Sequence, residues 1–164
     1  MSARSLWLRI GASCSVAAVL LLVAAPARPR AVAALPLAVS PAVGAITGLA
    51  LFAVLARRLP PSLPRIGATT AGVLLVLAGA EEVTWRWFLL GASAAVVGLP
   101  LAIASTSVGF GIAHRDAPRV HVVTGTVFGG AYATTGSLAC AWLAHGVYNL
   151  CAATILERPP EDQG

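Results

Sequence analysis

The sequence contains no lysine, and charged residues make up only 10% of its 164 residues. Soluble globular domains carry about 25% charged residues. Hydrophobic residues account for 58% of the chain, and the mean hydropathy is +0.85. This composition argues against a water-soluble domain and predicts a membrane protein in contact with a lipid bilayer.

Cysteine is also scarce, with only Cys14, Cys140 and Cys151. The three are odd in number, lie in apolar segments and lack the close spacing of metal ligands, so we interpret them as small buried hydrophobic residues. The net charge of +5 could suggest a nucleic-acid partner, but the arginines are spread through short connections rather than gathered on one face. The sequence therefore indicates neither redox chemistry nor nucleic-acid binding.

Long apolar runs fill the chain and leave no room for a soluble domain. A spanning helix needs about 20 apolar residues, and the breaks between such runs carry proline or arginine. The apolar segments are residues 6–25, 31–56, 66–95, 99–114, 119–134 and 137–156. We therefore predict an all-α membrane fold, a polytopic bundle of about six transmembrane helices. Residues 1–65 would form two N-terminal helices and a linker, and residues 157–164 a cytoplasmic tail.

Arginine is distributed unevenly between the two sides of this predicted bundle. With the N-terminus inside, only Arg28 and Arg30 fall in an outer connection. Cytoplasmic loops are enriched in arginine, so we predict a multi-pass protein with both termini in the cytoplasm. The richness in alanine, glycine, proline and arginine suggests a bacterial cell membrane. Arg4 and Arg9, followed by an apolar run and AAPA (24–27), also resemble a signal peptide, so cleavage of the first segment is an alternative.

Two glycine pairs have the small-xxx-small spacing that allows helices to approach closely in a membrane. They are Gly44 with Gly48 and Gly125 with Gly129. We interpret both pairs as sites of packing within the chain rather than of dimerisation.

Two adjacent glutamates and an arginine interrupt the third segment, in the stretch AGAEEVTWRWF. Ionised side chains are costly inside a membrane, so they are rare, face the bundle interior and pair with one another. Glu82 and Arg86 are four residues apart, the spacing at which side chains meet on a helix. We predict an ion pair between them. This pair could be purely structural, and a structural role would also be compatible with a nearby catalytic site. Glu81 points about 100° away around the helix and is left for another role, such as a general base or acid.

Further polar groups lie in the fourth and sixth segments. FGIAH ends the fourth segment at His114, and HGVYN puts His145 and Asn149 one helical turn apart. At a rise of 1.5 Å per residue, these side chains and Glu81 lie roughly 12 to 20 Å below the outer face. We therefore expect the four side chains to converge in the cytoplasmic half of the membrane. His121 matches no motif and is expected to be an interfacial residue near a loop.

Taken together, these polar groups resemble a known set of motifs. EExxxR as EEVTWR, FxxxH as FGIAH and HxxxN as HGVYN occur in that order on successive hydrophobic helices. They resemble the motifs of the CPBP family, the CAAX-protease and bacteriocin-processing (Abi-type) intramembrane endopeptidases. The resemblance covers about residues 66–156, which would form the catalytic helical core with the active site inside the bundle. Many relatives have glycine after the motif arginine, where this chain has Trp87.

The resemblance implies hydrolysis of peptide bonds in a membrane-associated peptide or protein. The site residues that it implies are Glu81, Glu82, Arg86, His114, His145 and Asn149. Glu81 and His114 would position and deprotonate the attacking water. His145 and Asn149 would donate hydrogen bonds to the oxyanion, and the glutamate–arginine ion pair would orient the site.

The same residues permit a mechanism with or without a metal ion. Two histidines and a glutamate can bind zinc with an open position for water. The HExxH arrangement of many zinc proteases is absent, because no histidine has another three or four residues away. We favour a glutamic-type mechanism without a cofactor, with zinc as the alternative.

Two other function classes are compatible with the composition. A catalytically inactive scaffold or immunity protein would keep the fold, but the complete set of motif residues argues against it. A small proton-coupled transporter subunit would also use intramembrane Glu, His and Arg. That function predicts inverted repeats or broken helices in corresponding halves, which the sequence lacks. The substrate, its cleavage site and the oligomeric state are not specified by the sequence.

Overall fold

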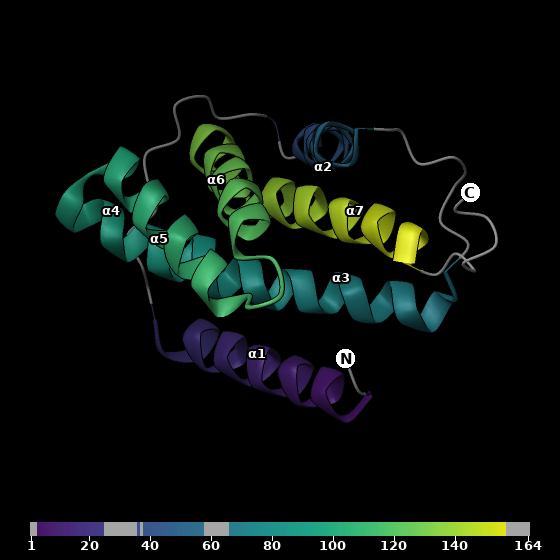
Figure 1. Ribbon diagram of the computed structural model, residues 1–164. Coiled ribbons are helices and arrows are strands. Elements are labelled where there is room, and N and C mark those ends of the chain that lie inside the picture. The colour runs from purple at the N-terminus through teal and green to yellow at the C-terminus, as the bar shows by residue number, and fades with distance from the viewer. Residues whose placement is uncertain (1–2, 25–35, 37, 58–65, 157–164) are drawn as a thin grey trace.

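The computed structural model describes residues 3–24, 36, 38–57 and 66–156, and within these ranges every regular element is a helix (Figure 1). The helices are α1 (Ala3–Val23), α2 (Ser40–Ala56), α3 (Ala68–Glu82), η1 (Val83–Leu90), α4 (Gly91–Val97), α5 (Leu99–Ala113), α6 (Pro118–Thr135) and α7 (Leu138–Leu156). Each apolar segment expected from the sequence contains one of these helices or a continuous run of them. The all-α fold class is therefore confirmed for the described residues.

The third predicted segment is not one regular α-helix. α3, η1 and α4 follow one another without a break, and η1 is a π-helix. π-Helical turns are rare and are frequent at functional sites. η1 begins directly after Glu82 and contains Arg86. Because a π-helix has more residues per turn than an α-helix, the side chains that follow Glu82 point in other directions around the helix axis than they would in an α-helix. The helical run ends at Gly98, whose φ of +81° lets the chain turn into α5.

The helices pack in the order α2, α7, α3 and α1, so that α7 lies between α2 and α3 (Figure 1). α5 and α6 pack against each other, α6 also contacts α7, and α1 contacts both α3 and η1. This arrangement brings the end of α3, the end of α5 and the middle of α7 together. These are the three positions that carry the polar motifs.

The predicted membrane spans can be compared with the length and hydropathy of the helices. Among the residues that the structure describes, no single helix combines the length and the hydropathy needed to cross a bilayer. The arginine-rich connections at residues 25–30 and 58–65, together with the predicted tail at 157–164, lie outside the described residues. The predicted topology and domain division therefore stay predictions.

Glycines on α2 allow it to lie directly against α7. A Cβ atom at Gly44 would overlap the carbonyl oxygen of Cys140, and one at Gly48 would overlap that of Ala144. The close packing predicted from the spacing of these glycines is thus confirmed, and it occurs within the chain. Gly125 likewise lies on α6 against the backbone of α5.

Gly48→Ala is expected to lower the free energy of unfolding by about 1–3 kcal/mol, because the added methyl group meets backbone that cannot move aside. Gly72→Ala is the matched control, since nothing lies within 4 Å of a Cβ atom at that exposed position of α3. The control should be neutral or more stable by up to about 1 kcal/mol. Thermal unfolding in detergent measures both variants, and equal midpoints would contradict the close contact between α2 and α7.

Candidate active site

A buried ion pair lies where α3 passes into η1. Glu82 and Arg86 are both 0% exposed, and Nε of Arg86 lies 3.3 Å from Oε2 of Glu82. The ion pair predicted from their spacing is therefore present. The guanidinium carbon of Arg86 also lies 5.0 Å from the centre of the Phe110 ring, a cation–π contact that further stabilises the buried cation.

Both site histidines use Nδ1 as a hydrogen-bond donor. Nδ1 of His145 lies 2.9 Å from Oε1 of Glu82, and an ionised carboxylate can only accept a hydrogen bond. Nδ1 of His114 lies 2.8 Å from the carbonyl oxygen of Phe110, which can also only accept. Because Nδ1 carries the proton in each ring, a neutral imidazole at either position presents an unprotonated Nε2.

The carboxylate of Glu81 lies between these two Nε2 atoms. Its Oε1 is 3.5 Å from Nε2 of His114, and its Oε2 is 3.7 Å from Nε2 of His145. Glu81 belongs to α3, His114 directly follows α5, and His145 belongs to α7. The convergence predicted for four side chains is therefore observed for these three.

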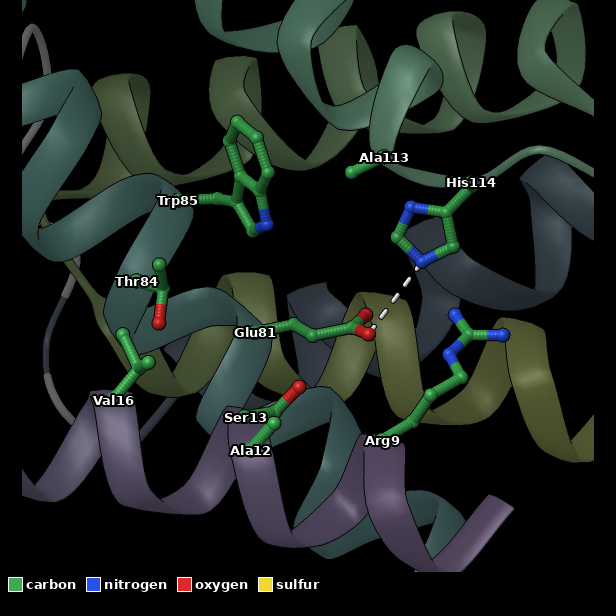
Figure 2. Close-up of a pocket in the computed structure, with 9 residues that line it drawn as sticks. All are labelled: Arg9, Ala12, Ser13, Val16, Glu81, Thr84, Trp85, Ala113 and His114. Carbon is green, nitrogen blue, oxygen red and sulfur yellow. Dashed lines mark ion pairs between the residues drawn. The ribbon is translucent and has the colours of Figure 1, made fainter. Parts of the chain in front are cut away.

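Glu81 and His114 line a cavity of about 270 Å³. Figure 2 shows the Glu81 carboxylate pointing toward His114, with residues of α1 on the opposite wall. The residues that line the cavity are Arg9, Ala12, Ser13, Val16, Glu81, Thr84, Trp85, Ala113 and His114. A molecule that enters the cavity therefore meets the carboxylate and one imidazole directly.

Asn149 is the last of the predicted site residues along the chain. It lies on α7 one turn after His145 and is partly buried. Within the described ranges, no hydrogen bond joins Asn149 to the other predicted site residues. Its role at an oxyanion stays a prediction.

Phe110 holds the cluster together, although the sequence analysis assigned it no role. Its ring is 0% exposed, and its centre lies 4.3 Å from that of His114 and 5.8 Å from that of His145. Its carbonyl accepts the His114 hydrogen bond described above. The signal was available, because Phe110 is the first residue of the FxxxH motif.

His121 is another residue that was not predicted to belong to the site, and here no motif indicated it. It was expected at an interface, but its ring is stacked on that of His114 with centres 4.2 Å apart and planes inclined by 28°. The edge of the His121 ring also meets Phe110, with ring centres 5.7 Å apart. His121 lies on α6 and follows a turn, so only the packing of α6 against α5 brings it to the site.

Histidine and carboxylate side chains are the groups that could hold a metal ion at this site. In the part of the chain that the structure describes, no group of three or more His, Cys, Asp or Glu side chains is arranged to hold a metal ion. The Nε2 atoms of His114 and His145 do face the Glu81 carboxylate, and both rings are oriented by hydrogen bonds through Nδ1.

Comparison with known proteins places these residues in a family. The family model described as type II CAAX prenyl endopeptidase, Rce1-like, matches residues 64–151, which is more than half of the chain and includes every predicted site residue. No curated protein and no solved structure shows a significant match. The resemblance stated from the three motifs is thereby confirmed. The chain belongs to the Rce1-like family of type II CAAX prenyl endopeptidases.

Proposed function

We propose that this protein is an intramembrane endopeptidase that hydrolyses a peptide bond of a membrane-associated peptide or protein. The observation that carries the proposal is the Glu81 carboxylate, which faces two imidazole Nε2 atoms and lines a cavity. Membership of an endopeptidase family supports the same reaction class. The description of the family names prenylated CAAX proteins; for this chain we propose the broader class of membrane-associated substrates.

Water activation by Glu81 and His114 follows from the hydrogen-bonding capacity of the two groups. When His114 is neutral, its Nε2 and the carboxylate oxygens are all acceptors, so they cannot bond to each other. A water molecule between them can donate one O–H to each. As its oxygen attacks the scissile carbonyl carbon, Glu81 takes one proton, and this proton passes to the amide nitrogen when the C–N bond breaks.

His145 is proposed to stabilise the oxyanion. Its Nδ1–H is already donated to Glu82, so Nε2 can donate to the oxyanion only when the ring is an imidazolium. The carboxylates of Glu81 and Glu82 flank the ring, so an imidazolium at this position would lie between two acceptors. The side-chain amide of Asn149 would supply the second donor from the next turn of α7. A donor of this kind is worth about 3 kcal/mol in the transition state.

The ion pair of Glu82 and Arg86 is proposed to orient His145 rather than to touch the substrate. Both side chains are buried, and Glu82 accepts hydrogen from Nδ1 of His145. Arg86 pairs with Oε2 of Glu82, and Oε1 of the same carboxylate accepts the hydrogen bond from His145. The pair thus determines which edge of the imidazole faces Glu81.

We further propose that the helical bundle is embedded in a membrane, with multiple passes and both termini in the cytoplasm. The composition supports this location, and so does the outer surface of the bundle. Large apolar side chains are widely exposed there, such as Leu22 at 85% and Val96 at 84%. Exposed apolar surface on this scale is unusual for a soluble monomer and suits contact with lipid.

The function is tested by mass spectrometry of membrane-associated peptide termini in cells that produce the native chain, Glu81→Gln or His145→Ala. We expect one set of termini to disappear in both variants while protein levels stay equal. Asp116→Asn is the matched control, because it makes the same acid-to-amide change at an exposed position. Identical termini in all four samples would contradict peptidase activity and favour an inactive scaffold.

Loss of the ring at His121 is expected to lower kcat about two- to tenfold, since an aromatic stack contributes about 0.5–1.5 kcal/mol. His121→Ala removes the stack on His114, whereas His121→Phe keeps a ring in its place. Steady-state kinetics of the purified variants should therefore show a smaller loss for phenylalanine than for alanine, with KM little changed. Equal rates for alanine and the native residue would show that the stack does not position His114.

Treatment with the zinc chelator 1,10-phenanthroline is expected to leave the cleavage rate unchanged within about twofold. In the proposed mechanism the water is activated by Glu81 and His114, without a metal ion. Zinc would bind through the same Nε2 lone pairs of His114 and His145 that face Glu81. A chelator would therefore stop cleavage in a zinc-dependent mechanism but not in the glutamic-type mechanism. Loss of activity that added zinc restores would replace the glutamic-type mechanism by a metal-dependent one.

A further inference from the structure

The cavity beside Glu81 is completed by a helix that the family match does not include. α1 contributes Arg9, Ala12, Ser13 and Val16 to the cavity wall, whereas the matched region begins at residue 64. α1 is held there by contacts with α3 and η1. The part of the cavity that α1 forms therefore lies outside the matched region, and its chemistry bears on what the site accepts.

The two ends of the cavity differ in polarity. In Figure 2, the guanidinium of Arg9 lies on the same side of the cavity as His114, and Val16 and Trp85 lie on the other side. The Glu81 carboxylate lies between the two ends. A ligand that spans the cavity thus meets a cation at one end, apolar groups at the other, and the reacting carboxylate in the middle.

A guanidinium in such a cavity is suited to a carboxylate. Its planar fork of N–H donors matches the two oxygens of a carboxylate, and hydrogen bonds between the two charged groups are short and strong. Arg9 lines the same cavity as Glu81 and His114. An anion bound by Arg9 is therefore held next to the groups that activate the water.

We propose that Arg9 binds a carboxylate of the substrate, so that the site selects apolar peptides with a carboxylate close to the scissile bond. The carboxylate is either the C-terminus of the peptide or an acidic side chain. A volume of about 270 Å³ is near the lower limit of ligand sites, so the cavity holds a short stretch of chain. This inference rests on the proposed function, because it treats the cavity as the substrate site.

The test measures the binding of fluorescein-labelled peptides of alanine and leucine to the full-length protein in detergent, by fluorescence anisotropy. Three versions of one peptide are compared: a free C-terminal acid, a C-terminal amide, and an amide with glutamate as its last residue. All measurements use the Glu81→Gln background, so that binding is not obscured by cleavage. Arg9→Gln and Arg9→Lys are introduced there, with the exposed Arg119→Gln as the charge-matched control.

We expect the free acid to bind about tenfold more tightly than the amide, as a charge-assisted hydrogen bond would give. Arg9→Gln should abolish this preference, Arg9→Lys should keep part of it, and Arg119→Gln should keep all of it. Tight binding of the glutamate-ended amide assigns the carboxylate to a side chain, and weak binding assigns it to the C-terminus. Equal binding of acid and amide, no binding of any peptide, or a preference that persists in Arg9→Gln overturns the inference.

Cleavage of the same peptides by the chain with native Glu81 separates this inference from the proposed function. If the acid is preferred through Arg9 but no peptide is cleaved, the carboxylate site stands and the peptidase function fails. If acid and amide are cleaved at equal rates and Arg9→Gln has no effect, the function stands and the inference fails.

Discussion

Glu81→Gln is expected to reduce the rate of peptide cleavage by about 10²- to 10⁴-fold, the range that a positioned general base contributes. Glutamine keeps the size of the side chain but cannot take a proton from water. Its amide would also donate to one of the Nε2 atoms that now lie 3.5 and 3.7 Å away, which fills the position proposed for the water. The fold should persist, because Glu81 carries no part of the ion pair between Glu82 and Arg86.

The measurement is the single-turnover rate of the purified variant in detergent or nanodiscs, with KM determined alongside. Glu81→Asp serves as a second variant: it restores the carboxylate but shortens its reach by one methylene, so its rate should lie between the other two. Asp116→Asn should behave like the native chain. A Glu81→Gln enzyme that retains more than about a tenth of the native rate would show that another group activates the water.

Arg86→Met is expected to lower the free energy of unfolding by about 3–5 kcal/mol, the cost of leaving one partner of a buried pair without the other. Glu82 is 0% exposed, and without Arg86 its nearest cationic partner would be the imidazole of His145. The loss of the guanidinium also removes the contact with the Phe110 ring. Methionine roughly keeps the apolar volume of the arginine stem, so the effect reports on charge more than on packing.

A double variant, Glu82→Gln with Arg86→Met, tests this explanation. It removes both charges and should recover most of the lost stability, because neutral replacement of a buried ion pair is often well tolerated. Activity should stay low, because an amide at position 82 can donate as well as accept and no longer gives Nδ1 of His145 an anionic acceptor. Thermal unfolding measures stability, and Arg119→Gln at an exposed site should stay within about 0.5 kcal/mol of the native chain. If the single and double variants are equally unstable, the ion pair is not the origin of the effect.

Local sequence was sufficient for the helices and for one contact of the site. Each apolar segment forms one helix or a continuous run of helices, because an apolar run between proline- or glycine-containing breaks has no better way to satisfy its backbone. The ion pair of Glu82 and Arg86 was also accessible, since residues four apart meet on a helix regardless of what surrounds them. The order of the three motifs also predicted that Glu81, His114 and His145 lie close to one another.

Other features depended on how the helices pack. The π-helical turn of η1 was not expected, because its hydrogen-bond pattern differs from that of an α-helix by one residue and leaves no periodic signal in eight residues. The hydrogen bond from His145 to Glu82 decides which imidazole nitrogen faces Glu81. Spacing along the sequence could not show this, since the two residues belong to different helices.

The sequence by itself thus determined the helical class and the buried ion pair, because these depend on composition or on contacts within one helix. The order of its three motifs also identified the groups proposed to carry out hydrolysis. The tertiary structure alone decided that His121 stacks on His114, that Phe110 lies at the centre of the cluster, and that Arg9 reaches the cavity from α1. These contacts join residues far apart in the chain. Their positions are set by the relative placement of whole helices, which no local pattern encodes.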